Sequence, residues 1–489
     1  MIHELIIDKT ANYEVVVCGG GMTGFAAAVT AARQGKKTIL IEKTGCLGGV
    51  ATSSAVTSLL GGMDYEDGNF RFVTGGLFKE LYYKLREKDE CVDIYKINRN
   101  RSPHAWYSGL SEAIIYNNEA MKRLLDNLTV ESGCDLLYFS QFIDIKCEGN
   151  RIKYILIANK DGITSITGNV FVDCTGDADL AFRAGCTIVK GRTEDNLMMP
   201  ATLIMDLENV DTETLLTYIE ENDSPRFREE IKKLREAGEW NFPIEIYISF
   251  LLNRPGSHMV NSIRQVGIDG TDAKSLTRGM IEGRRDNKKL FEIVKNNFPG
   301  YKDSVISSMA ETIGIRETRR IVGEYMLTLD DLLEGKDFDD IICISSYCFD
   351  VPDPKRPSYQ PLEGKQIKKK YAEVPYRCML PDKLDNLIVA GRSISVERIV
   401  MGPLRVMGPC IGMGQAAGMA AVISSIENIS LRDVDVSQLQ DRLLGLDCII
   451  DEEMYVLWRE VYENNISWRC KRCHRFKSLY RNRKYPNTY

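Results

Sequence analysis

The opening of the chain alternates short β-branched runs with one segment of small apolar residues. Residues 15–17 are all valine and predict a strand, the alanine-rich stretch 25–34 predicts a helix that Gly35 ends, and 38–41 predicts a second strand. The letters CGGGMTGF form the turn between the first strand and the helix. A strand–turn–helix–strand unit of this kind is typical of the start of an α/β domain.

The same periodicities recur along the chain. The further predicted elements are helices near 76–87 and 118–132, strands at 136–146, 152–159 and 163–173 with a hairpin turn at 161–162, a charged helical stretch at 212–237, a strand at 386–390 and a Gly/Ala-rich helix at about 412–426. The segment 351–361 carries four prolines and predicts a connecting loop. The pattern therefore predicts one α/β domain built from both ends of the chain and interrupted by an α+β domain.

The order of the predicted elements and the proline-rich loop sets the predicted domain boundaries. They are a first part of the α/β domain at 10–195, an inserted substrate or cap domain at 196–370, a second part at 371–430, and a C-terminal helical extension with a basic tail at 431–489. The last 21 residues carry eight Lys/Arg and no Asp/Glu, so the tail is +8 while the whole chain is −6. We interpret the tail as solvated or docked on the acidic body, with nucleic-acid binding as a weaker alternative.

Composition narrows the class of protein. The 489 residues are 44% hydrophobic and 27% charged, which is typical of a globular protein and excludes a disordered chain. The N-terminus lacks the pattern of a signal peptide, and no run of about 18 uncharged apolar residues is recognised, so no membrane span is predicted. Fourteen cysteines without a secretory context predict reduced thiols and a cytoplasmic protein.

The first turn carries a dinucleotide-binding fingerprint. Gly19, Gly21 and Gly24 give G-x-G-x-x-G between a strand and a helix, and Glu42 ends the next strand at about the distance the motif requires. Gly19 permits the tight turn, Gly21 lets the backbone approach a pyrophosphate, and Gly24 allows close packing of helix on strand. The N-terminus of the helix from Thr23 onward offers N–H groups to phosphate, Met22 precedes it in the turn, and Glu42, next to Lys43, accepts from ribose hydroxyls.

Both NAD and FAD are bound by this device, and three features favour FAD. The motif lies near the N-terminus, and a second glycine loop with Gly48 and Gly49 follows Glu42 at once. Further glycine turns occur far away, at 174–177 and 391–392. We see no second complete fingerprint for a separate nicotinamide domain. These features predict a Rossmann-like domain that binds FAD without a covalent link.

At this point the residues resemble a known family. The chain resembles the FAD-dependent oxidoreductases of the glutathione-reductase structural class, and within it a group distantly related to fumarate-reductase flavoproteins. The resemblance covers about 14–425 and rests on motifs that include GCLGGVATS, VDCTGDADLAFRAG and DNLIVAGRSISVERIVMGPLRVMGPCIGMGQAAGMAA. Beyond the fingerprint residues, it implies cofactor contacts from Gly48, Gly49, Phe142, Thr175, Gly176, Asp177, Gly391, Arg392, Gly414 and Gln415.

Two of these positions have a physical rationale. The resemblance places Gly414 and Gln415 at the start of a helix that faces the flavin pyrimidine, where the positive helix end stabilises reduced flavin. The alternative is that this small-residue helix only packs on a sheet. The chain also departs from the family, because Arg398 stands where members often have His, and Pro403-Leu404-Arg405 replaces a Ser-x-Arg segment.

Catalytic candidates are few. His104 and His258 are flanked by arginines and are candidates for the acid/base group, with a hydrogen-bonded structural histidine as the alternative for each. Arg398 and Arg405, beside the predicted flavin helix, are candidates for binding an anionic organic substrate, since guanidinium groups bind carboxylates bidentately. For the arginines at 316–320 we favour salt bridges with Glu311, Glu317 and Glu324.

Cysteine spacing adds little. Cys46 lacks the nearby partner that a redox-active dithiol requires, and Cys470, Cys473 and His474 match C-x-x-C-H but leave a zinc site short of a fourth ligand. We predict no metal site.

The sequence leaves two main hypotheses on function. The first is an enzyme that transfers hydride between flavin N5 and a small organic substrate, and the second is an FAD-carrying electron-transfer subunit. The sequence leaves open a homo-oligomer or a redox partner protein, and a flavin-binding RNA-linked protein is a weak third hypothesis.

Overall fold

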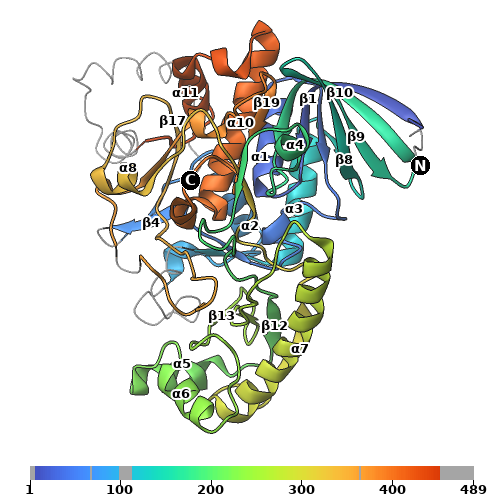
Figure 1. The fold of residues 1–489 in the computed structure, drawn as a ribbon. Coiled ribbons are helices and arrows are strands. Elements are labelled where there is room, and N and C mark those ends of the chain that lie inside the picture. The colour runs from blue at the N-terminus through green and yellow to red at the C-terminus, as the bar shows by residue number, and fades with distance from the viewer. Residues whose placement is uncertain (1–5, 67–68, 98–112, 363–364, 452–489) are drawn as a thin grey trace, which may run out of the picture.

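The structure is a computed structural model that describes residues 6–66, 69–97, 113–362 and 365–451. Its upper part is an α/β layer structure around one large mixed sheet, and a smaller α+β part lies below it (Figure 1). The tail residues Cys470, Cys473 and His474 and the candidate His104 lie outside the described residues.

The main sheet has the strand order β7-β2-β1-β10-β9-β8, with β19 paired to β10. Its strands are β1 (Lys9–Cys18), β2 (Thr38–Ile41), β7 (Asp135–Leu137), β8 (Gln141–Glu148), β9 (Arg151–Asn159), β10 (Gly162–Asp173) and β19 (Leu387–Val389). The strands β7, β2, β1, β10 and β19 run parallel, whereas β9 and β8 are antiparallel additions. The carboxyl ends of the parallel strands therefore meet at one edge, where ligands bind in such folds.

The long strand β10 joins the two ends of the chain. Its first half pairs with β9 through the hairpin turn at Gly162, and its last three residues pair with β19, more than 200 residues later. The parallel part of the sheet thus contains β1 near the N-terminus and β19 near the C-terminus. This confirms the predicted α/β fold assembled from both ends of the chain.

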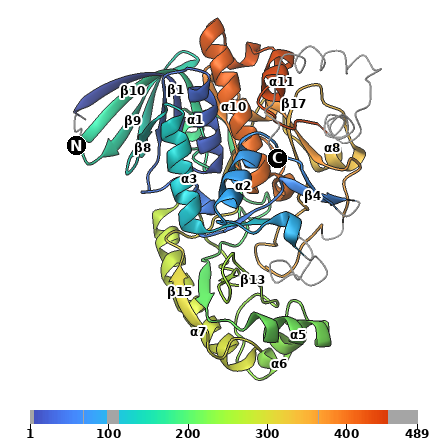
Figure 2. The same ribbon diagram turned by 180° about the vertical axis from the view of Figure 1, so that it is seen from behind.

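Two buried helices cover one face of this sheet. Helix α1 (Met22–Arg33) and helix α10 (Met407–Glu427) lie side by side against the strands, as Figures 1 and 2 show. Small residues let their backbones approach, since a Cβ on Gly414 would lie 2.2 Å from the carbonyl oxygen of Thr23, and one on Gly418 2.4 Å from that of Ala27. The other helices of this part are α2 (Leu77–Glu87), α3 (Asn118–Glu131), α4 (Asp179–Arg183), α8 (Leu329–Glu334), α9 (Met401–Leu404) and α11 (Val436–Leu444).

Helix α10 corrects one statement of the sequence analysis. Residues 407–426 carry no charge, so the chain does contain a run long and apolar enough to cross a membrane. In the structure 83% of the most apolar window is buried inside the protein. The helix is uniformly apolar because α1, the sheet and neighbouring elements surround it, which makes it a core helix of this fold.

We expect the α1–α10 contact to make a measurable contribution to stability. Replacing Gly414 by alanine forces the two helices apart, and overpacking of a close-packed core costs about 1–3 kcal/mol. Urea unfolding of the variant measures this loss. The matched control on the same helix is Ile426→Ala, because Ile426 is 54% exposed and such surface changes stay within about 0.5 kcal/mol. Equal stability of the two variants would contradict the packing role.

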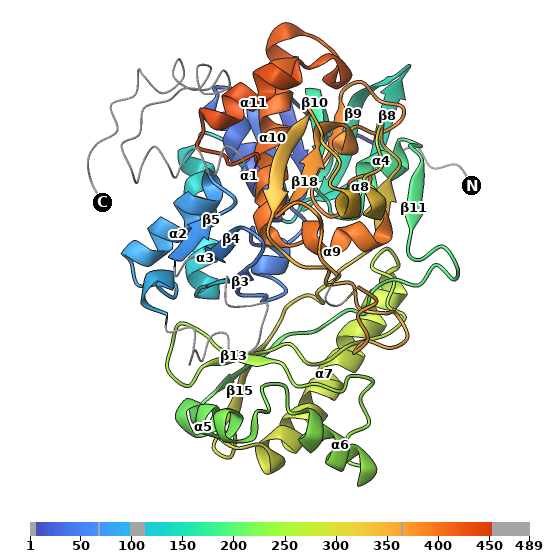
Figure 3. The ribbon, with the colours of Figure 1, turned by 90° about the vertical axis from the view of Figure 1, so that its left-hand side faces the viewer.

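The lower part has its own sheet and hydrophobic core. The antiparallel sheet has the order β13-β14-β12-β15, with strands β12 (Met205–Glu208), β13 (Ser249–Leu251), β14 (His258–Val260) and β15 (Val305–Met309). Helices α5 (Thr212–Asn222), α6 (Arg228–Glu236) and α7 (Ala273–Asn297) accompany it (Figure 3). A separate apolar cluster that includes Trp240, Phe227 and Phe298 fills this part.

Within the described residues, four two-stranded sheets pair further segments of the chain. They are β3 (Ser58–Leu59) with β6 (Ile114–Ile115), β4 (Met63–Glu66) with β5 (Asn69–Phe72), β11 (Ile188–Lys190) with β16 (Arg319–Ile321), and β17 (Ile341–Ser345) with β18 (Ala372–Pro375). The last two pairs each join segments from the two sides of a boundary placed at 195 or 370. The exact domain boundaries therefore stay predictions.

Most predicted elements are present, and three differ. The segment 136–146 holds two strands, β7 and β8, and the charged stretch 212–237 holds two helices that are separated around Asp223, which has a left-handed φ of 47°. Helix α10 begins at Met407, five residues before the prediction. Proline is tolerated there because Pro409 lies in the first turn, where its missing N–H would have no partner within the helix.

Candidate functional site

The glycine turn after β1 is built by close backbone contacts. Gly19 has a φ of 95°, and a Cβ there would lie 2.4 Å from the carbonyl oxygen of Cys174. A Cβ on Gly24 would lie 1.8 Å from the carbonyl oxygen of Gly19. A Cβ on Gly21, by contrast, would meet no protein atom within 4 Å. Gly19 and Gly24 thus serve the packing of the turn, whereas Gly21 keeps a space open.

The second glycine loop lies directly against the first. The Gly48 N–H donates to the carbonyl oxygen of Gly20 at 2.8 Å, and Gly48 and Gly49 both have positive φ values, 100° and 54°. A Cβ on Gly49 would lie 3.2 Å from the Cα of Gly21. The two loops and the first turn of α1 therefore form one backbone-lined cradle, as the sequence predicted from separate motifs.

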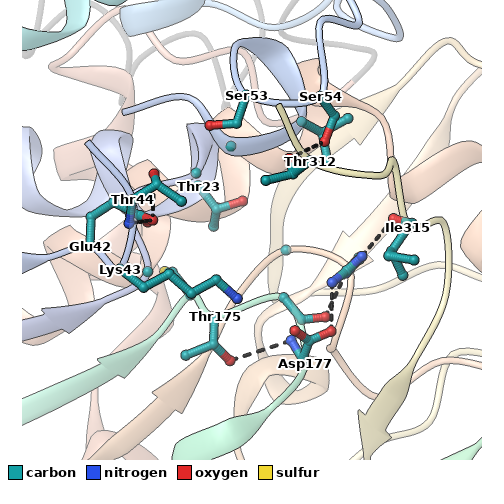
Figure 4. A pocket seen from close by; sticks show the side chains of 18 of the residues that line it. Thr23, Glu42, Lys43, Thr44, Ser53, Ser54, Thr175, Asp177, Thr312 and Ile315 are labelled. Atoms are coloured by element: carbon teal, nitrogen blue, oxygen red, sulfur yellow. Dashed lines mark hydrogen bonds and ion pairs between the residues drawn. The ribbon is translucent and has the colours of Figure 1, made fainter. Parts of the chain in front are cut away.

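The space in front of this cradle is a cavity of about 530 Å³, which we call cavity 1. Its lining includes every predicted cofactor residue except Gly24, Gly414 and Gln415. Figure 4 shows Glu42 and Lys43 on one side of it, Thr175 and Asp177 on another, and Ser53, Ser54 and Thr312 farther along. The carboxyl ends of β1, β2 and β10 thus converge on one elongated pocket.

Glu42 is fixed at the end of β2 by hydrogen bonds to its carboxylate. One oxygen accepts from the Gly20 N–H at 2.7 Å, and the other accepts from the N–H and hydroxyl of Thr44 at 2.8 and 2.9 Å. The residue is buried and lines cavity 1. Each carboxylate oxygen can accept more than one hydrogen bond, so the group remains able to accept from a hydroxyl in the cavity.

Arg392 lines cavity 1 and is hydrogen-bonded to three neighbouring groups. Its guanidinium donates to the Gly176 carbonyl, to the Ile315 carbonyl and to the Asp177 carboxylate, each at 2.6 Å. The Thr318 hydroxyl also donates to Asp177, at 2.7 Å. Arg392 therefore connects the turns that follow β10 and β19, both predicted cofactor loops, with a segment near residue 315.

The structure corrects the assignment of Gly414 and Gln415. Both lie within α10 rather than at its start, with Gly414 packed on α1 and the Gln415 side chain accepting from the Leu77 N–H at 3.2 Å. The end of α10 that reaches cavity 1 is its true N-terminus, because Met407 and Cys410 line the cavity. The predicted helix end near the cofactor is present, but other residues form it.

A second cavity of about 440 Å³, cavity 2, adjoins the first. The two share the lining residues Val50, Ile315, Arg392, Arg405 and Met407. Cavity 2 extends from this junction to the lower part of the molecule, where β13 and β14 contribute Phe250 and Met259. A molecule in cavity 2 would therefore lie next to whatever fills cavity 1.

Arg405 stands at the junction and is paired with a carboxylate. Its Nη2 donates to the Asp350 carboxylate at 2.5 Å and to the Asp350 carbonyl at 3.0 Å. Its Nε is buried and has no hydrogen-bond partner. Burial raises the pKa of Asp350, but the guanidinium groups of Arg405, Arg316 and Arg264 outweigh it and hold that pKa below the ordinary carboxyl value.

Arg398 and His258, the other catalytic candidates among the described residues, line neither cavity. Arg398 donates to the carboxylate of Glu317 at 3.0 and 3.1 Å, and Glu317 also binds Arg320 at 3.0 Å. The charge of Arg398 is thus paired with a fully buried carboxylate, and its role as a substrate ligand stays a prediction. Of the salt bridges predicted for 316–320, the one to Glu317 is confirmed, whereas Glu311 and Glu324 pair with Lys122 and Arg432.

His258 is a buried residue of β14. Its Nε2 lies 2.9 Å from the Thr212 hydroxyl and its Nδ1 3.2 Å from the Ser249 hydroxyl, so both ring nitrogens have hydrogen-bond partners. The structure therefore places His258 in the alternative role, as a hydrogen-bonded core histidine. Among the described residues, no histidine lines either cavity.

Several lining residues had no signal in the sequence analysis. In cavity 1 they include Ser53, Ser54, Met280, Thr312 and Cys410, and in cavity 2 the apolar wall Ile244, Ile246, Ile248 and Phe250. The second set does carry a pattern, since apolar residues alternate with others from 244 to 250 as in an extended segment with one buried face. The first set comes from loops and from helices α7 and α10, which only the fold brings together.

Comparison with known proteins decides the family. The family described as FAD dependent oxidoreductase matches residues 14–443. The chain belongs to this family. A Dictyostelium discoideum protein named as a bifunctional amine oxidase is 40% identical over 72 residues, which are 14% of this chain and 7% of that protein. The chain thus spans only a small share of that curated relative.

Solved structures resemble the FAD-dependent oxidoreductase over most of its length. A geranylgeranyl bacteriochlorophyll reductase-like protein from Thermoplasma acidophilum is 14% identical with a TM-score of 0.44, covering 96% of this chain and 100% of its own. The p-nitrophenol 4-monooxygenase of Pseudomonas putida is 10% identical with a TM-score of 0.45, covering 96% and 93%. These comparisons do not confirm the closer resemblance to glutathione reductase or to fumarate reductases.

Cavity 1 fits the FAD that this family uses. The space beyond Gly21, the cradle of the two glycine loops and the N-terminus of α1 suit a pyrophosphate. Glu42 at the end of β2 suits the adenosine ribose, and Phe142 lies in the lining with Ser140 and Gln141. The enzyme is therefore an FAD-dependent oxidoreductase, and the residues that line cavity 1 fit its cofactor.

Proposed function

We propose that this enzyme transfers hydride between FAD held in cavity 1 and a small organic substrate held in cavity 2. The observation that carries the proposal is the junction, where Arg405, Arg392 and Met407 line both cavities. FAD, when bound, supplies the hydride-transfer chemistry, and the protein supplies position, charge and exclusion of water.

The residues of this chain divide that work. The glycine cradle and Glu42 bind and orient the cofactor along the ends of the parallel strands. The N-terminus of α10 at Met407 carries the positive end of a 21-residue helix, which favours negative charge at the cavity by about 0.3–1 kcal/mol. Arg405, held in place by Asp350, presents a positive charge at the junction. It is the candidate to bind or polarise the substrate.

The first test is the visible spectrum of purified protein before and after denaturation. We expect a yellow protein that releases about one FAD per chain on denaturation, because backbone N–H groups and the Glu42 carboxylate would hold the cofactor by hydrogen bonds. Colour that stays with the denatured chain would contradict non-covalent binding. A folded, colourless protein that takes up no FAD would contradict the proposed function itself.

The second test addresses Arg405. We expect Arg405→Met to lower kcat/KM by roughly 10–1000-fold, the range for loss of one charged group that orients a substrate or stabilises developing charge. Arg405→Lys keeps the positive charge but loses the planar, two-pronged guanidinium, so its kcat/KM should lie between those of Arg405→Met and the wild type. The readout is flavin reduction by the substrate found in a panel of acids, alcohols and unsaturated carboxylates. Unchanged turnover in Arg405→Met would refute this role.

A further inference from the structure

Cavity 2 is lined by two chemically different sets of side chains. One set is an arginine cluster, which we define as Arg264, Arg316 and Arg405 around Asp350. The other is an apolar wall, made of Val56, Leu60, Ile204, Ile244, Ile246, Ile248, Phe250 and Met259. Its volume of about 440 Å³ lies within the range of sites that enclose organic ligands.

The arginine cluster has more positive than negative charge. Three guanidinium groups surround Asp350, which is the single acid among the described residues that line cavity 2. Arg264 and Arg316 both donate to the Thr202 hydroxyl, at 2.9 and 2.8 Å, so their guanidiniums are neighbours. Burial, together with the charges of Arg264 and Arg405, lowers the pKa of Arg316. An anion in the cavity would relieve this repulsion.

Arg316 makes its hydrogen bonds to the described residues through Nη1 alone. Its Nη1 donates to the Pro200 carbonyl at 2.6 Å and to Thr202, and these contacts fix the side chain. Among the described residues, no acceptor pairs with its Nε or Nη2 and no carboxylate forms an ion pair with it. Nε and Nη2 form the planar fork that binds a carboxylate through two parallel hydrogen bonds.

The buried Nε of Arg405 is a second, independent sign of a missing acceptor. It has no hydrogen-bond partner although the neighbouring Nη2 is fully engaged with Asp350. Buried donors in native proteins nearly always have a partner. An oxyanion seated between Arg316 and Arg405 would supply one, at the junction with cavity 1.

We infer that the substrate of this oxidoreductase is an amphipathic carboxylate, with its carboxylate on Arg316 and its extended apolar body along the Ile244–Phe250 wall. The inference rests on the proposed function and deepens it, because it assigns the class of substrate and moves the main anion ligand to Arg316. Arg398, which the sequence suggested, takes no part, since it pairs with Glu317.

The test is a binding series on the FAD-loaded full-length protein. Straight-chain carboxylates from butanoate to decanoate, and 4-phenylbutanoate, are titrated beside their primary amides, with calorimetry and the flavin absorbance as readouts. We expect carboxylates to bind at least roughly 10-fold more tightly than amides, the value of a charge-assisted pair. Affinity should rise about threefold to fourfold for each added methylene, because each buries apolar surface on the wall.

Single substitutions test the arginine cluster and the apolar wall separately. Arg316→Gln should weaken octanoate binding roughly 10–100-fold and leave octanamide binding unchanged, and Arg264→Gln should act in the same direction. Arg316→Lys should restore part of the loss. Ile246→Asn should remove most of the dependence on chain length. The matched control is Arg254→Gln, because Arg254 pairs with Glu208 at the surface and does not line cavity 2.

The outcomes separate this inference from the proposed function. Equal affinity for octanoate and octanamide, equal losses of both in Arg316→Gln, or no binding of any carboxylate to yellow protein would overturn the carboxylate assignment alone. The FAD content of every sample is measured in parallel. Protein that folds but takes up no FAD would overturn the proposed function, whatever it binds in cavity 2.

Discussion

Replacement of Gly21 by valine is expected to give a folded protein that has lost its flavin. The backbone at Gly21 is extended, with φ −63° and ψ 177°, which valine adopts without strain, and a Cβ there meets no protein atom within 4 Å. The new side chain would instead fill the space that the cofactor pyrophosphate requires. FAD affinity should fall by roughly 10–100-fold for each charge-assisted hydrogen bond lost.

The measurements are the FAD content of the purified protein, an FAD titration and thermal unfolding without flavin. The matched control is Gly24→Ala, three residues later in the same motif, where the added Cβ would lie 1.8 Å from the Gly19 carbonyl oxygen. That variant should lose stability first and flavin as a consequence. Wild-type FAD affinity in Gly21→Val would show that cavity 1 holds the cofactor in another way.

Removal of the Glu317 carboxylate is expected to cause the largest loss of stability among single charge changes. Its side chain is fully buried and binds Arg320 and Arg398, and it also accepts from the Met199 N–H at 2.9 Å. Glu317→Ala leaves two guanidiniums without their carboxylate in the core. Breaking a buried ion pair from one side costs about 3–5 kcal/mol. Urea unfolding at pH 7 measures the loss.

A surface ion pair provides the comparison for Glu317. Glu148→Ala removes the partner of Lys153 at 3.1 Å, with both side chains more than half exposed, and should cost less than about 1 kcal/mol. Similar losses in the two variants would contradict the core role of Glu317. The same series tests Arg398, since a structural residue lowers stability when replaced by methionine but leaves turnover per folded molecule intact.

Local patterns predicted the glycine cradle and the place of Glu42 beside it. The β-branched run of β1, the three spaced glycines and Glu42 lie within about 30 residues of one another, so their geometry is set largely by neighbouring backbone. The second glycine loop follows directly and could only fold back against the first. Short-range sequence therefore contained nearly all the information for the cradle.

Sequence patterns did not predict the role of a residue where two different structural roles favour the same residue type. Gly414 lies in a small-residue helix, and small residues serve helix–helix packing as well as close approach to a ligand. Gly408 and Pro409 are typical of a turn, yet they form the first turn of α10. Arg398 and Arg405 are seven residues apart and look equivalent, but their partners, Glu317 and Asp350, come from distant segments.

The sequence by itself determined the α/β fold class and membership of the FAD-dependent oxidoreductases, and it predicted the glycine cradle, because the cradle depends on turn chemistry and spacing within one β–α–β unit. Only the tertiary structure decided which arginines line a cavity, that His258 is a core residue, and that an apolar wall from 244–250 lines the same cavity as the arginine cluster. The physical reason is the sequence separation of the residues that come into contact. A cofactor turn is made by neighbours in the chain, whereas a substrate site is made by charges and surfaces that meet only after the chain has folded.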